Sequence, residues 1–249
     1  MARLNRLLNC TFIVAPLAAA ISYSSTSFAQ EPLDEVRVNL KEYMPTLQID
    51  SLRETPVQGL YELISQGQIA YVTEGGRYII TGDLIDMQTR QNLTTQVQNK
   101  QRQAIVASIP DEQKIIYPAV GEKKYEILIL TDLSCPFCEK LHHELPALNE
   151  AGVEVHYLLT PRHGPGSPTF IESSKVMCSD DKKKLIDIAM KRQNIDGEAC
   201  MDDLISQNLQ LARELGMSGT PHIILPDGTP LPGFRPANEI LAAIEQTAK

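Results

Sequence analysis

The sequence has 249 residues, 22% of them charged, and its formal net charge is −8 at pH 7. Even after removal of an N-terminal signal peptide, the chain would be longer than a usual single domain, so we expect two domains. The acidic balance offers no basic face to nucleic acid, so no nucleic-acid partner is expected.

The first 29 residues have the three parts of a secretory signal peptide. Arg3 and Arg6 precede an apolar run, and small residues follow it up to Ala29, where we expect cleavage. A membrane anchor is the alternative, but the run is shorter than the ~20 residues that span a bilayer, and Pro16 interrupts it. Nothing later in the chain is apolar enough to cross a membrane. The pattern therefore predicts export to an oxidising compartment.

Cleavage would remove Cys10 and leave four cysteines, an even number that indicates disulfides in such a compartment. Three pairings are possible. The spacing favours Cys135 with Cys138 and Cys178 with Cys200, and a zinc site is the alternative.

Residues 30–88 are expected to form a small N-terminal domain. Residues 33–44 place Leu33, Val36, Leu40 and Tyr43 at helical spacing before Pro45. Four segments rich in Val, Ile, Tyr and Thr then predict an antiparallel sheet: residues 47–52, 59–65, 69–74 and 77–87. So small a sheet is marginal alone, and we expect an edge strand to pair with a second copy of the chain.

Residues 89–110 are expected to link the two domains. The stretch 89–108 is polar, lacks Gly and Pro, and suits a helix with Asn92 as its cap and Pro110 after its end. A helix that is polar almost all round indicates a spacer, and the alternative is an ordinary surface helix of the first domain.

Residues 111–249 alternate strands and helices in the order of a thioredoxin-like α/β domain with a helical insertion. The sequence thus predicts an α+β protein. Strands are expected at residues 114–119, 125–133 and 153–159, a hairpin at 222–234, helices at 136–151, 202–215 and 236–246, and a largely helical stretch at 171–192.

Cys135 and Cys138 form a C-x-x-C pair where a buried strand gives way to a helix, and Pro136 suits the first helical turn. The free N–H groups of a helix start stabilise a thiolate, so we expect Cys135 to be the nucleophile and Cys138 the resolving thiol. Zinc would need two more ligands, and only His142 could add one. We instead expect His142 and His143 to be one packed and one solvated residue, with neither a metal nor a cofactor at the site.

A second chemical signal is Gly219-Thr220-Pro221, directly before an apolar strand. Proline at the start of an edge strand is one explanation. Beside a C-x-x-C pair, the preferred one is a cis proline facing the dithiol, with the Thr220 backbone free to pair with a substrate strand.

The signal peptide, small domain, helical spacer, SCPFCEKLH, HYLLTPRHG, VMC, EAC and GMSGTPHIILPDGTPLPGF together resemble the periplasmic thiol:disulfide isomerases of the DsbC/DsbG family, and DsbC in particular. The resemblance implies a V-shaped homodimer joined through the N-terminal domains, which reshuffles the disulfides of misfolded secreted proteins and binds them as a chaperone does. It also implies that the inner-membrane protein DsbD keeps the dithiol reduced. Cys135 would attack, Cys138 would resolve, Thr220 and Pro221 would form the cis-proline pair, and Cys178 with Cys200 would form a structural disulfide.

One feature departs from the DsbC pattern. Pro136-Phe137 is closer to the Pro-Tyr of DsbG than to the Gly-Tyr usual in DsbC, and residues between the cysteines influence redox poise. A DsbG-like reductase and chaperone is therefore the alternative, whereas a DsbA-like oxidase should lack the N-terminal sheet and spacer. Outside this class, a holdase and a zinc-dependent structural protein are further hypotheses.

Overall fold

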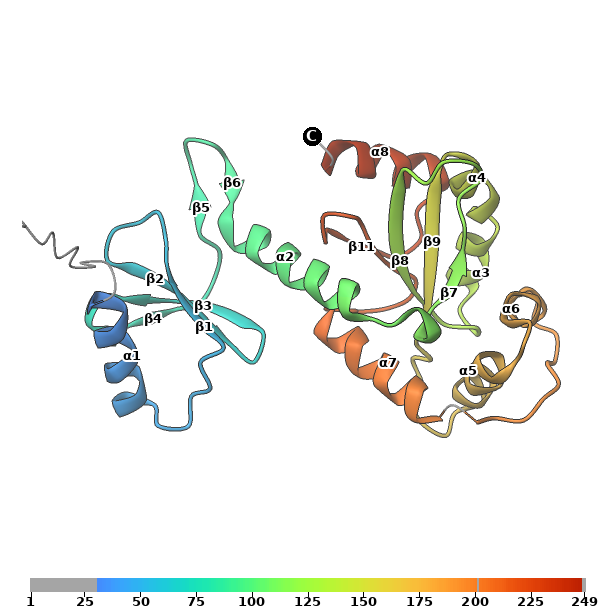
Figure 1. Ribbon diagram of the computed structural model, residues 1–249, viewed down its shortest axis with the longest axis horizontal. Coiled ribbons are helices and arrows are strands. Elements are labelled where there is room, and N and C mark those ends of the chain that lie inside the picture. Colours follow the sequence, from blue (N-terminus) through green and yellow to red (C-terminus); the bar gives the residue numbers. More distant parts are fainter. Residues whose placement is uncertain (1–30, 201, 248–249) are drawn as a thin grey trace, which may run out of the picture.

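The computed structural model describes residues 31–200 and 202–247. They form a small N-terminal sheet domain and a larger α/β domain, with the helix α2 (Leu93–Ser108) between them (Figure 1). The expected signal peptide, its cleavage point and Cys10 lie outside the described residues. In the described part of the chain, no helix combines the length and the apolar character needed to cross a bilayer.

The N-terminal domain packs one helix, α1 (Glu31–Tyr43), against a four-stranded antiparallel sheet of order β1-β2-β3-β4. Val36 and Leu40 of α1 are buried against the sheet, whereas Tyr43 is exposed, contrary to its place in the apolar spacing. The strands are β1 (Ser51–Glu54), β2 (Leu60–Ser65), β3 (Gln68–Thr73) and β4 (Ile79–Ile80). The predicted antiparallel sheet is confirmed, although the first strand begins four residues later than expected and the last is short.

The β2–β3 hairpin shows why its turn has the sequence Gln66-Gly67. Ser65 pairs with Gln68, which leaves a two-residue loop, and both loop residues have positive φ angles, 49° and 74°. Such a turn matches the twist of the strands and requires a residue, preferably glycine, that tolerates this conformation.

A separate two-stranded ribbon, β5 (Ile85–Asp86) and β6 (Gln91–Asn92), leads into α2. Asn92 caps the helix by accepting a hydrogen bond from the Thr95 backbone N–H at 2.9 Å, which agrees with the predicted cap. The first residues of the stretch 89–108 precede this cap, and Gln91 and Asn92 pair with β5 instead of joining the helix.

The C-terminal half of α2 is attached to the α/β domain. Arg102 Nε donates to the Gly228 carbonyl at 2.7 Å, Asn99 Nδ2 donates to Thr229 at 2.8 Å, and Ile105 packs on the apolar cluster beneath. A Cβ atom on Gly228 would lie 2.0 Å from the Asn99 carbonyl oxygen, so only glycine permits this approach. The second half of α2 is therefore packed on the surface of the α/β domain.

The α/β domain has a five-stranded sheet of order β11-β10-β8-β9-β7. The central pair is parallel, and every other pair is antiparallel. The strands are β7 (Ile115–Tyr117), β8 (Tyr125–Thr131), β9 (Val153–Leu159), β10 (His222–Ile224) and β11 (Pro230–Pro232). Strand β8 is buried on both faces: Ile127 and Ile129 belong to the main core, whereas Leu128 and Leu130 face α2 and the end of α7.

The helices of this domain are more divided than the sequence predicted. The expected helix 136–151 is two helices, α3 (Pro136–His142) and α4 (Leu145–Glu150), and the break has a local cause: Pro146 has no N–H for a bond one turn back. The stretch 171–192, which was expected to be largely helical, contains parts of two helices. These are α5 (Pro168–Cys178) and α6 (Lys182–Met190), followed by α7 (Asp202–Glu214) and α8 (Ala237–Thr247).

Candidate active site

The C-x-x-C pair lies where β8 passes into α3. Cys135 is the N-cap of the helix and Pro136 occupies its first turn, where a missing N–H costs nothing. The Cys135 carbonyl accepts the backbone N–H groups of Cys138 and Glu139 at 3.0 and 3.1 Å. This short helix start places both sulfur atoms at the same end of the sheet.

Both cysteines are free thiols in the structure, and both are almost completely covered. Cys135 is 2% exposed and its Sγ donates to the Thr220 carbonyl at 3.3 Å, while Cys138 Sγ accepts the Asp132 backbone N–H at 3.5 Å. Phe137 between them is 54% exposed. The surface above the dithiol therefore presents an aromatic ring.

The two thiols have opposite acidities. Burial raises the pKa of Cys135, but hydrogen-bonding groups of Thr220, Cys138 and Phe137 lower it by more, so its pKa lies below the ordinary value. Burial dominates at Cys138 and raises its pKa to about 12. Of the two sulfur atoms, the site therefore favours the thiolate form at Cys135 and the protonated thiol at Cys138.

The Thr220–Pro221 peptide bond is cis and directly precedes β10. Thr220 is buried, and its carbonyl accepts the Cys135 thiol, so the loop lies against the dithiol although 85 residues separate the two in sequence. The strand order explains this approach, because β10 pairs antiparallel with β8 and begins at the edge where β8 ends.

No sequence signal assigned a role to Asp132 and Arg162, which form an ion pair beside the dithiol with the carboxylate buried. The Asp132 carboxylate is fully buried and accepts four bonds at 2.7–2.9 Å: from the Ser134 N–H and hydroxyl, and from the backbone N–H and Nε of Arg162. Burial raises the pKa of Asp132, and these bonds lower it by more. The Asp132 carbonyl also accepts the Cys135 N–H at 3.0 Å, so the pair holds the loop that presents Cys135. A charged residue directly after a buried strand was the available signal.

His142 is packed and His143 is exposed, which agrees with the prediction for the two histidines. His142 Nε2 lies 2.9 Å from Asp187 and Nδ1 lies 3.3 Å from the Tyr157 hydroxyl, so the ring faces these groups rather than the cysteines. Burial lowers its pKa, although Asp187 opposes the shift.

The other two cysteines form a disulfide. It joins Cys178 at the end of α5 to Cys200 before α7, with Cα atoms 5.9 Å apart. It thereby closes the segment that contains α6 and the loop after it.

Comparison with known proteins identifies the family of each domain. Residues 27–95 match the disulfide bond isomerase protein N-terminal domain, and residues 111–248 match the thioredoxin-like domain. The chain is 32% identical to thiol:disulfide interchange protein DsbC of Dickeya dadantii, over 80% of this chain and 82% of the relative. It is 30% identical to DsbC of Escherichia coli over 96% of each chain. A solved disulfide interchange protein from Neisseria gonorrhoeae is 24% identical, with a TM-score of 0.48 over 55% of this chain and 97% of that one.

A thioredoxin-like domain with a C-x-x-C pair at a helix start, preceded by an isomerase-type N-terminal domain, defines a thiol-disulfide oxidoreductase. Within that class, the chain belongs to the DsbC family of thiol:disulfide interchange proteins. Its enzymatic activity is disulfide isomerisation.

Proposed function

We propose that Cys135 is the attacking thiol of this isomerase and Cys138 its resolving thiol. The observation that supports this assignment is the opposite pKa shift of the two sulfur atoms, lowered at Cys135 and raised at Cys138. Only a thiolate attacks a disulfide, so the group with the lower pKa reacts first.

The reaction begins when the Cys135 thiolate attacks one sulfur of a non-native disulfide. A mixed disulfide forms, and the other substrate sulfur leaves as a thiolate. That thiolate can attack a second substrate disulfide, after which a substrate thiolate displaces Cys135 and the bonds have been reshuffled. Alternatively Cys138 loses its proton and attacks Cys135, which releases a reduced substrate and oxidises the pair.

Substrate would bind at the Thr220–Pro221 loop. Because the Thr220 carbonyl lies 3.3 Å from Cys135 Sγ, a substrate strand paired with this backbone would hold its disulfide next to the nucleophile. The exposed ring of Phe137 offers an apolar contact beside it. Both features suit extended, partly unfolded secreted proteins, and a chaperone-like affinity for them.

A second copy of the chain would bind the N-terminal domain at β4 and the β5–β6 ribbon. Strand β4 is the edge of its sheet, and large apolar side chains on and around these strands are exposed by 41–82%: Tyr78, Ile79, Ile80, Ile85 and Met87. An open edge beside exposed apolar groups is what an isologous strand-paired interface covers. We expect the α2 helices of such a homodimer to hold the two dithiols apart across an open cleft.

The cellular setting follows from the expected signal peptide and the family. We place the mature protein in the periplasm, where an oxidised pair would need an external reductant, and we expect DsbD of the inner membrane to supply the electrons. The structural role of the Cys178–Cys200 bridge suits the same oxidising compartment.

The test is rescue of a scrambled multi-disulfide substrate by the full mature chain, compared with Ile80→Asp and with Val120→Asp, which alters an exposed apolar residue in the other domain. We expect Ile80→Asp to sediment as a monomer and to rescue poorly while it still reduces small disulfides, and Val120→Asp to behave as the parent. A monomeric parent would remove the dimer from the mechanism. Reduction without any rescue by the parent would instead favour the DsbG-like reductase that Pro136-Phe137 suggests. Activity on a cysteine-free unfolded protein would reveal holdase function.

A further inference from the structure

The end of β8 that carries the dithiol lies between two loops. Strand β10 pairs antiparallel with β8, so its start, at the Thr220–Pro221 loop, lies beside the end of β8. Strand β9 pairs parallel with β8 on the other side, so the loop that follows it, residues 160–167, reaches the same edge of the sheet. Cys135 therefore has the cis-proline loop on one side and the loop of Arg162 on the other.

Asp132 connects the second loop to both cysteines. Its carboxylate accepts the Nε–H of Arg162 at 2.9 Å, its carbonyl accepts the Cys135 N–H at 3.0 Å, and its own N–H donates to Cys138 Sγ at 3.5 Å. One residue thus contacts the guanidinium group and both members of the dithiol. Asp132 raises the pKa of Arg162, and the thiolate charges of Cys135 and Cys138 raise it further, which agrees with a cation beside the dithiol.

Asp132 uses only part of the guanidinium group. The Nε and the backbone N–H of Arg162 bind the carboxylate, whereas Nη1 and Nη2 donate to no group in the part of the chain that the structure describes. These two nitrogens carry the remaining N–H donors, in the planar arrangement that fits a carboxylate. The Asp132 side chain is fully buried and the Arg162 side chain is 37% exposed, so the cation is the member of the pair that a substrate can contact.

Lys140 adds positive charge to the same surface. It is exposed, and its Nζ lies 5.4 Å from the centroid of the Phe137 ring. The neighbouring anion, Glu139, has a cation of its own, because Arg192 Nε lies 3.5 Å from its carboxylate. Positive charge is therefore exposed beside the dithiol, although the net charge of the chain is −8.

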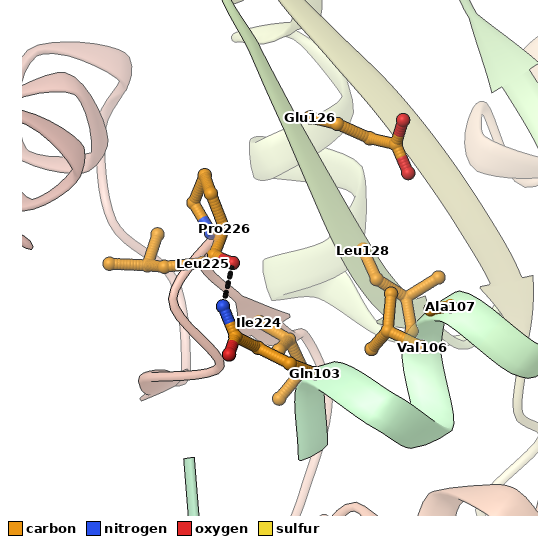
Figure 2. Close-up of a pocket in the computed structure, with 8 residues that line it drawn as sticks. All are labelled: Gln103, Val106, Ala107, Glu126, Leu128, Ile224, Leu225 and Pro226. Atoms are coloured by element: carbon orange, nitrogen blue, oxygen red, sulfur yellow. Dashed lines mark hydrogen bonds between the residues drawn. The ribbon is translucent and has the colours of Figure 1, made fainter. Parts of the chain in front are cut away.

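The groove beside α2 has the opposite character. Figure 2 shows that among the eight residues drawn there the one charged side chain is an anion, Glu126. An acidic segment of a client protein is therefore attracted to the surface at the dithiol and not to this groove.

We propose that Arg162 selects client disulfides that have an aspartate or glutamate next to one of their cysteines, by binding that carboxylate through its free Nη groups. The inference rests on the proposed function, in which a client strand pairs with the Thr220 backbone and Cys135 attacks its disulfide. A strand held in this way lies between the two loops. Successive residues of a strand are about 3.3 Å apart, so a carboxylate one position from the client cysteine lies near the guanidinium group. Arg162 is thus a residue that determines specificity.

The test uses three disulfide-linked peptide dimers, Ac-Gly-Cys-X-amide with X as Asp, Asn or Lys, and measures their initial rates of reduction by the reduced full mature protein. Each rate is divided by that of the Asn peptide, so a change in the pKa of Cys135 cancels. At low salt, the Asp/Asn ratio should be about three- to fivefold lower in Arg162→Met than in the parent, and the Lys/Asn ratio should be higher. Arg162→Lys should fall between them, because an ammonium group has no planar fork.

The control is Arg213→Met, which removes an exposed arginine in the last turn of α7 and changes the net charge equally, and it should keep the ratios of the parent. The proposal is overturned if Arg162→Met or Arg162→Lys keeps the Asp/Asn ratio of the parent, or if Arg213→Met lowers it as much as Arg162→Met does. If Arg162→Met does not fold, Arg162→Lys decides alone. A parent that reduces none of the three peptides would instead contradict the attack by Cys135, whereas equal ratios in the parent and the Arg162 variants would contradict only the selection.

Discussion

Replacing Asp132 by Asn should destabilise the protein more than any other single change at the loop before Cys135. The fully buried carboxylate accepts four bonds, and Asn would turn an N–H₂ group toward donors of Ser134 or Arg162. Breaking a buried ion pair costs roughly 3–5 kcal/mol. The Arg162 side chain is 37% exposed and can regain water, so we expect a loss near the lower end, about 3 kcal/mol.

Arg162→Met should cost less, about 1–2 kcal/mol, since Asp132 keeps three donors: the Ser134 N–H, the Ser134 hydroxyl and the backbone N–H of residue 162. The two variants should also move the reactivity of Cys135 in opposite directions. Removing the Arg162 cation removes a positive charge near the thiolate and raises the pKa of Cys135, whereas removing the Asp132 anion lowers it.

Urea unfolding of the oxidised proteins gives the first comparison, and the pH profile of iodoacetamide alkylation gives the second. Ser134→Ala is the matched control, because it removes one neutral donor and leaves both charges in place. Equal stability of Asp132→Asn and the parent, or alkylation profiles that shift in the same direction in both charge variants, would refute this account of the pair.

Three further predictions address the cysteines and the buried histidines. Cys135→Ser should abolish thiol-disulfide exchange, whereas Cys138→Ser should still attack substrates and accumulate mixed disulfides on a non-reducing gel. If the Cys138 variant alone lost alkylation near pH 6, the attacking thiol would be Cys138 and the resolving thiol Cys135. Replacing Cys178 and Cys200 by Ala opens a loop with a sequence separation of 22 residues and should cost about 3 kcal/mol on the loop-entropy estimate, with dithiol chemistry retained; loss of turnover in the folded variant would make that pair catalytic. Burial lowers the pKa of His222 and of His142, so the unfolded chain binds more protons than the folded one, and the free energy of unfolding should fall as pH drops below about 6.5. In urea unfolding, His222→Leu should lose less stability than the parent between pH 7 and 5. An equal loss in the variant and the parent would contradict the lowered pKa of His222.

Features set by neighbouring residues could be predicted from the sequence. The C-x-x-C pair before a helix, the Asn92 cap and the alternation of strands and helices depend on signals within a few positions, and the structure has the cap and the order of elements along the chain that these signals indicate. The break at Pro146 was equally local, and it was missed because the apolar spacing of the segment continues through it.

Features set by strand register could not be predicted in the same way. Arg162 lies 30 residues after Asp132, and Glu154 lies 28 residues after Glu126, so each pairing depends on how β9 aligns with β8. Shifting that alignment by one residue would turn His156 away from Glu126. The packed half of α2 is a similar case, because its contacts with Thr229 and Gly228 become visible only once β10 and β11 form their hairpin.

The pKa difference within the dithiol gives a physical reason why this protein would isomerise rather than only reduce. Burial raises the pKa of Cys138 to about 12 and so disfavours its thiolate, which slows resolution of the mixed disulfide by Cys138. During that delay, thiolates of the bound substrate can attack Cys135 or one another. Burial of Cys138 thus lengthens the life of the mixed disulfide, and we infer that a change that lowers its pKa would shift the products from reshuffled toward reduced substrate.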